Sequence, residues 1–62
     1  MFFDAKMVLD TVIARLIHKG MSPTEAKATA TANAAAARDA LANGWNGKRG
    51  TTAIMRFADS LL

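Results

Sequence analysis

The stretch Gly20–Met21–Ser22–Pro23–Thr24–Glu25 decides the fold, because one helix is predicted to end in it and another to begin within three residues. Gly20 follows a run with helical apolar spacing and can adopt the left-handed backbone conformation that closes a helix. Ser22 is a good N-cap, Pro23 suits the first helical position, and Glu25, three residues after the cap, completes a capping box. The sequence therefore predicts a tight connection between two helices.

The residues before this turn predict a helix from about Asp4 to Lys19, with Asp4 as its N-cap. Phe3 and Val8 have the spacing of a hydrophobic staple around that cap. At the other end, a Schellman-type closure would bring Met21 into contact with Leu16. The apolar face of this helix is broad, and it is formed by Ala5, Met7, Val8, Leu9, Val12, Ile13, Leu16 and Ile17.

The residues after the turn predict a second helix from about Pro23 to Asn43, because ten of the seventeen residues from Ala26 to Ala42 are alanine. The threonines and Asn33 are expected to weaken it only locally. Small side chains let another backbone approach closely, so this helix is expected to form a central slab. Its packing face would consist of Ala26, Ala30, Ala34 and Ala37.

The segment from Gly44 to Gly50 holds three of the four glycines and predicts a flexible loop. A short third helix is expected from Thr51 or Thr52 to Leu62, with an apolar face of Ile54, Phe57, Ala58, Leu61 and Leu62. Strand-like alternation is absent from the sequence. We therefore expect one all-α domain over residues 1–62, a small three-helix domain in which two longer helices form an αα-hairpin.

Composition limits the classes of function. The chain has 62 residues, no cysteine, a single histidine (His18) and a net charge of +3. A domain of this size buries only about 60% of its unfolded surface, so oligomerisation is the expected source of added stability. We expect no metal site and no cofactor, because one histidine without cysteines does not make a zinc site. Neither a signal peptide nor a run of about 20 apolar residues is evident, which favours a cytoplasmic protein.

Catalysis is not expected, because the five acidic residues are scattered and His18 has no acid or nucleophile close to it in sequence. Gly47–Lys48 superficially suggests a phosphate-binding loop, but Arg49 stands where that motif has Ser or Thr, and no strand precedes it. A weaker anion site remains at the start of the third helix, where Lys48 and Arg49 adjoin backbone N–H groups. Its alternative is a solvated basic loop.

The turn residues Gly20–Met21–Ser22, together with Ala26, resemble the helix–turn–helix family of DNA-binding domains over about twenty residues. This resemblance implies a basic DNA-binding regulator whose second helix reads the major groove. The sequence departs from the family at Leu16, where a small residue is usual, and in its long alanine-rich second helix. Phosphate contacts would come from Lys19, Lys27, Arg38, Lys48 and Arg49.

The broad apolar face of the first helix favours another function, a non-enzymatic protein–protein interaction module. This would be a homodimer, and a regulator or inhibitor of the phage or plasmid accessory kind that binds a larger partner. The alternative is that the whole face lies in the monomer core. A third function, a membrane-active bacteriocin-like helix, is disfavoured by Asp4 and Asp10. No small-molecule substrate is expected. The partner-binding residues would be Leu9, Ile13, Trp45, Arg49 and Arg56.

Overall fold

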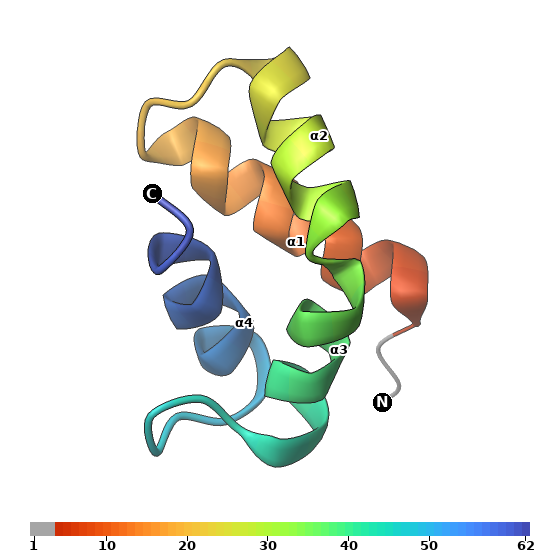
Figure 1. Ribbon diagram of the computed structural model, residues 1–62. Coiled ribbons are helices and arrows are strands. Elements are labelled where there is room, and N and C mark those ends of the chain that lie inside the picture. Colours follow the sequence, from red (N-terminus) through yellow and green to blue (C-terminus); the bar gives the residue numbers. More distant parts are fainter. Residues whose placement is uncertain (1–3) are drawn as a thin grey trace.

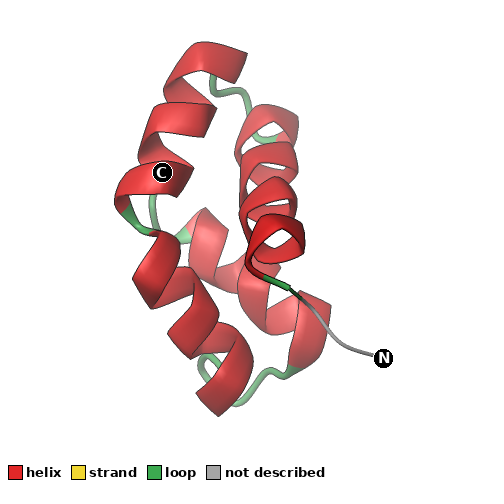
Figure 2. Cartoon of the chain, turned by 90° about the vertical axis from the view of Figure 1, so that its right-hand side faces the viewer, coloured by secondary structure: helices red, strands yellow, loops and turns green. Residues whose placement is uncertain are grey.

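A computed structural model describes residues 4–62, in which the chain forms four helices and no β-strand. The predicted all-α fold class is confirmed. The helices are α1 (Ala5–His18), α2 (Pro23–Ala32), α3 (Ala34–Asn43) and α4 (Gly50–Asp59) (Figure 1). Short loops connect them, as the turned view in Figure 2 shows.

The connection between α1 and α2 follows the local rules that predicted it. Gly20 has a φ of +109°, its N–H donates to the carbonyl of Ile17 at 3.0 Å, and Met21 donates to that of Leu16 at 3.0 Å. This is the bonding pattern of a Schellman motif. Ser22 Oγ then accepts from the N–H of Glu25 at 3.2 Å, which is one of the two bonds of the predicted capping box.

The start of α1 is capped as expected. Asp4 Oδ1 accepts from the N–H of Met7 at 2.8 Å, so the carboxylate satisfies one of the free donors of the first turn. The hydrophobic staple predicted between Phe3 and Val8 involves Phe3, which lies outside the described residues.

The single helix predicted from Pro23 to Asn43 is divided at Asn33, so the three-helix prediction is wrong. Asn33 has φ −114° and ψ 18°, outside helical geometry, and its Nδ2 donates to the carbonyl of Thr29 at 2.8 Å. Asparagine side chains compete with the backbone for such carbonyls, and this competition favours helix ends. Asn33 thus ends α2 and begins α3, with Ala37 N–H donating to its carbonyl at 2.9 Å.

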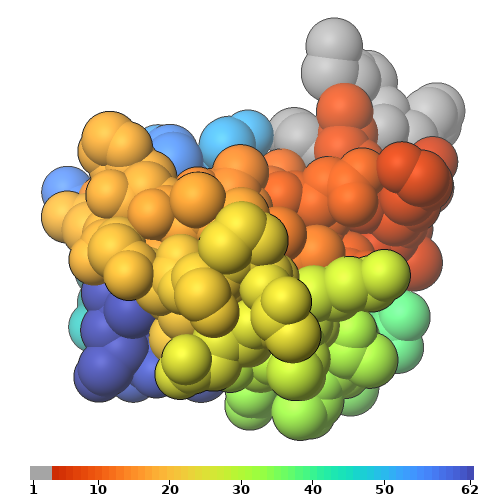
Figure 3. Space-filling model, turned by 90° about the horizontal axis from the view of Figure 1, so that it is seen from above, coloured from red at the N-terminus to blue at the C-terminus, as the bar shows by residue number. Residues whose placement is uncertain are grey.

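The central helix is α1, not the alanine-rich segment that was predicted to be the slab. It packs against α2, α3 and α4, and Figure 3 shows its side chains meeting those of α2 along the surface. Val8, Val12 and Leu16 on α1 and Ile54 on α4 are the largest fully buried side chains. The buried residues that α2 and α3 add are all alanines: Ala26, Ala30, Ala37 and Ala40. Ala34, also predicted to lie in this face, is half-buried.

The predicted loop between Gly44 and Gly50 contains a hydrogen-bonded turn. The N–H of Trp45 donates to the carbonyl of Lys48 at 3.0 Å, and the N–H of Lys48 donates to the carbonyl of Trp45 at 2.8 Å. Asn46 and Gly47 between them have φ values of 48° and 78°, as a type I′ turn requires. Gly44 precedes this turn at a φ of +83°, where an added Cβ would lie 2.8 Å from the Lys48 carbonyl oxygen.

Candidate protein-interaction site

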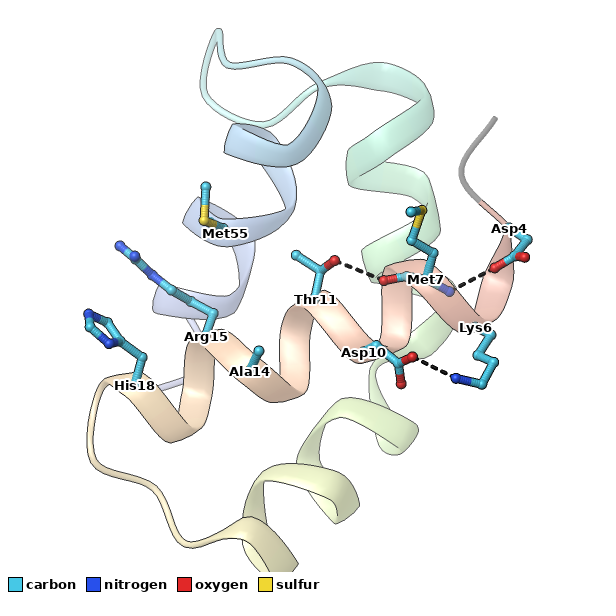
Figure 4. A pocket seen from close by; sticks show the side chains of 9 residues that line it. All are labelled: Asp4, Lys6, Met7, Asp10, Thr11, Ala14, Arg15, His18 and Met55. Atoms are coloured by element: carbon cyan, nitrogen blue, oxygen red, sulfur yellow. Dashed lines mark hydrogen bonds and ion pairs between the residues drawn. The ribbon is translucent and has the colours of Figure 1, made fainter. Parts of the chain in front are cut away.

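An open groove of about 640 Å³ follows one side of α1, where Met55 of α4 forms part of its wall (Figure 4). We call it the α1–α4 groove. The residues that line it are Asp4, Lys6, Met7, Asp10, Thr11, Ala14, Arg15, His18 and Met55. Eight of the nine come from α1 or its N-cap, so the geometry of one helix determines most of the surface.

The middle of the groove offers apolar surface. Met7 is 42% exposed, Ala14 is exposed, and Met55 is half-buried. Thr11 lies between the first two along the helix, and its hydroxyl donates to the carbonyl of Met7 at 2.8 Å. Because that hydroxyl is satisfied within the helix, Thr11 needs no polar partner in the groove.

The charges along the groove are partly paired within the chain. Lys6 Nζ lies 2.8 Å from Asp10 Oδ2, and both side chains are exposed. Hydrogen bonding to Asp10 raises the pKa of Lys6. A surface pair of this kind contributes little to stability. Because both side chains are more than half exposed, both groups remain accessible to a partner.

At the other end, Arg15 joins α1 to the C-terminus of α4. Its Nε and Nη2 donate to the two carboxylate oxygens of Asp59 at 2.8 and 3.0 Å, a bidentate arrangement, and Arg56 Nη1 lies 3.7 Å from the same carboxylate. Hydrogen bonding to Arg15 lowers the pKa of Asp59 and raises that of Arg15. This pair fixes the position of Arg15 at the edge of the groove.

The apolar face of α1 that sequence reasoning assigned to a partner is largely covered by the chain itself. Leu9 and Ile13, two of the predicted partner-binding residues, are half-buried and pack against the core. The large apolar side chains of α1 that stay exposed are Met7 and Ile17, at 42% and 40%. The accessible part of the helix is therefore the side next to this face, which carries the groove.

The predicted rim of Trp45, Arg49 and Arg56 is not brought into the groove. Trp45 is half-buried and packs edge-on against Phe57, with ring centroids 5.4 Å apart and planes at 86°. Arg49 is exposed at the N-cap of α4, and the Arg56 side chain is 55% exposed. Trp45 thus has a structural contact that sequence reasoning did not foresee.

The residues predicted to contact nucleic acid are exposed but do not form one patch. Lys19 lies in the α1–α2 turn and Lys27 lies on α2, whereas Lys48 and Arg49 lie in the turn before α4. Figure 1 places these two turns at opposite ends of the molecule, and Arg38 lies on α3 between them in the chain.

Within residues 4–62, no group of three or more His, Asp or Glu side chains is placed to hold a metal ion, and none of the described helices has the length and apolarity needed to cross a bilayer. In comparisons with known proteins, no family model, curated protein or solved structure matches this chain.

Proposed function

We propose that this protein is a small, non-enzymatic helical interaction module that forms a homodimer and acts by binding a larger protein, as a regulator or inhibitor. The observation that carries the self-association is the α1–α4 groove, an accessible surface with an apolar middle and charged ends on the central helix. Such a composition, apolar at the centre and polar at the rim, is typical of protein interfaces.

The composition of the core supports self-association. Among residues 4–62, the largest fully buried side chains are Leu16, Ile54, Val8 and Val12, whereas α2 and α3 supply alanines, which bury little apolar area per residue. A domain of 62 residues with such a core is close to the limit of independent stability. Covering Met7 and Met55 with a second copy would add apolar burial that the monomer lacks.

The proposal can be tested by placing a large charged side chain in the groove. Ala14 and Ala28 are both exposed helical alanines, but Ala14 lines the groove and Ala28 lies on α2. We expect the wild-type chain and Ala28→Arg to sediment as dimers at concentrations of tens of micromolar, and Ala14→Arg to sediment as a monomer with unchanged helical circular dichroism. A wild-type chain that stays monomeric up to about 1 mM, where only contacts weaker than about −4 kcal/mol escape detection, would refute self-association.

A DNA-binding function is the second candidate, and one observation favours it. Because α2 ends at Ala32, it is a short helix of ten residues, closer to a recognition helix than the long helix predicted from the sequence. Against it, the exposed N-terminal part of α2 carries Glu25, an acid, and Lys27 is its single base. Fluorescence anisotropy of a labelled DNA duplex, titrated with the protein at about 50 and 200 mM salt, separates the two functions, because it reports binding anywhere on the protein and phosphate-dominated binding falls steeply with salt.

A further inference from the structure

Five of the groove residues repeat with a spacing of three and four. Asp4, Met7, Thr11, Ala14 and His18 line the groove, and their numbers follow the a and d positions of two heptads. In Figure 4 they run along one side of α1, while Lys6 and Asp10 point to the other side. We call these five residues the seam.

The seam has the same length on either side of Thr11. Asp4 stands seven residues before it and His18 seven residues after it, which corresponds to about 10 Å of helix each way. Met7 stands four residues before it, and Ala14 three after. A two-fold axis at Thr11 would therefore place Asp4 of one copy against His18 of the other, and the large Met7 beside the small Ala14.

The charges along the seam favour this antiparallel direction. Its N-terminal end carries the acid Asp4, and its C-terminal end carries His18, with Arg15 at the edge. An imidazole N–H donates to a carboxylate in either protonation state of the histidine, so an Asp4–His18 contact is favourable in both. A parallel pairing would instead bring each acid against the same acid. Antiparallel helices also bring opposite ends of their macrodipoles together.

We propose that the α1–α4 groove is occupied by α1 of a second copy of this chain, running antiparallel, with the two-fold axis at Thr11 and Met55 of each copy covering the side of the contact. The proposal rests on the homodimer of the proposed function and names its face. Small residues at Thr11 and Ala14 allow the two helices to approach closely at the axis, and Met7 supplies the side chain that fills the space.

Cysteine cross-linking tests this arrangement without background, because the chain has no cysteine. Single-cysteine chains are made at Thr11→Cys, Met7→Cys and Ala14→Cys, with Ala28→Cys on α2 as the control for random collision. A disulfide needs Cα atoms within about 7 Å. In the antiparallel pair, Met7 and Ala14 of different copies are offset by about 1.5 Å along the axis, whereas two Met7 residues are about 12 Å apart.

Under a mild oxidant, we expect Thr11→Cys to form a covalent dimer far above the Ala28→Cys level. An equimolar mixture of Met7→Cys and Ala14→Cys should form the mixed dimer at least five times faster than either chain links to itself. Self-linking of Met7→Cys and of Ala14→Cys that is faster than the mixed link would show a parallel pair, and equal rates would show no preferred register. Either result overturns the antiparallel arrangement.

Two further outcomes separate this inference from the function on which it rests. If the wild-type chain sediments as a dimer but none of the seam cysteines links above the Ala28→Cys control, the dimer uses another face and only the seam is refuted. If the wild-type chain is monomeric and no cysteine links, both the seam and the homodimer are refuted.

Discussion

In the α1–α4 pair, the buried residues include large side chains, namely Val8, Val12 and Leu16 on α1 and Ile54 and Phe57 on α4, whereas the buried residues of α2 and α3 are all alanines. The first pair is also joined by the bidentate Arg15–Asp59 contact. The two halves of the molecule therefore fill the same interior in opposite ways. Helices α1 and α4 supply large side chains that fill the core, whereas the small side chains of α2 and α3 let their backbones approach the neighbouring helices closely.

This difference determines how each half should respond to substitution. A large side chain that becomes small leaves a cavity, and the cost includes both lost burial and the unfilled volume. An alanine that becomes large must push a neighbouring helix away, because a close-packed interior holds no spare space. The stability of the fold should thus be sensitive to smaller side chains at the large buried positions of α1 and α4, and to larger side chains at the buried alanines of α2 and α3.

The largest effect is expected from Leu16→Ala, because Leu16 is 0% exposed and the largest of the fully buried side chains. Such truncations cost about 2–5 kcal/mol, which approaches the total stability of a small domain. We expect the variant to be largely unfolded at 37 °C by far-ultraviolet circular dichroism. A urea midpoint close to that of the wild type would show that the core does not depend on the large residues of α1.

A smaller effect, of about 1–3 kcal/mol, is expected from Ala30→Leu on α2. Ala30 is 0% exposed and faces the core, so the added side chain has no space. The matched control is Ala28→Leu, two residues earlier on the same helix, where the alanine is exposed. Thermal unfolding should give a lowered midpoint for the first variant and an almost unchanged one for the second. Equal midpoints would mean that α2 is not closely packed.

The same contrast explains which features could be predicted from the sequence. The Asp4 cap, the Schellman closure at Gly20 and the cap at Ser22 all depend on bonds between residues at most five apart, so local rules identify them. The break at Asn33 is local as well, and its signal is the side chain that bonds Thr29. High alanine content favours a continuous helix, but one asparagine amide that bonds a preceding carbonyl competes with that propensity.

Other features depend on tertiary contacts or on a short turn motif. The role of α1 as the central helix depends on which faces meet, and helical periodicity predicts only that a face exists. Met55 of α4 forms part of the wall of the α1–α4 groove, and the sequence does not show that this residue lies beside α1. The spacing of the groove residues on α1, by contrast, is visible in the sequence. The dipeptide Asn46–Gly47 is a strong local signal of a type I′ turn, which the prediction of a flexible glycine-rich loop does not include.

The smallest predicted effect concerns Asp59, which links the C-terminus of α4 to α1. Because Arg15 lowers the pKa of Asp59 in the folded state, the unfolded chain binds a proton there first as the pH falls. The contact thus stabilises the fold above about pH 4, and this contribution is lost as the pH falls through the lowered pKa. Asp59→Asn should lower the midpoint of thermal unfolding at pH 7 and make its decline below pH 4 shallower.

Asp39→Asn provides the matched control, because it removes the same charge from α3, away from the contact between α1 and α4. Its midpoint should decline with acid as steeply as that of the wild type, since the Arg15–Asp59 contact is intact. If Asp59→Asn instead follows the wild-type curve at every pH, the bidentate contact contributes nothing to folding. The α1–α4 pair would then differ from the α2–α3 pair by the volume of its side chains alone.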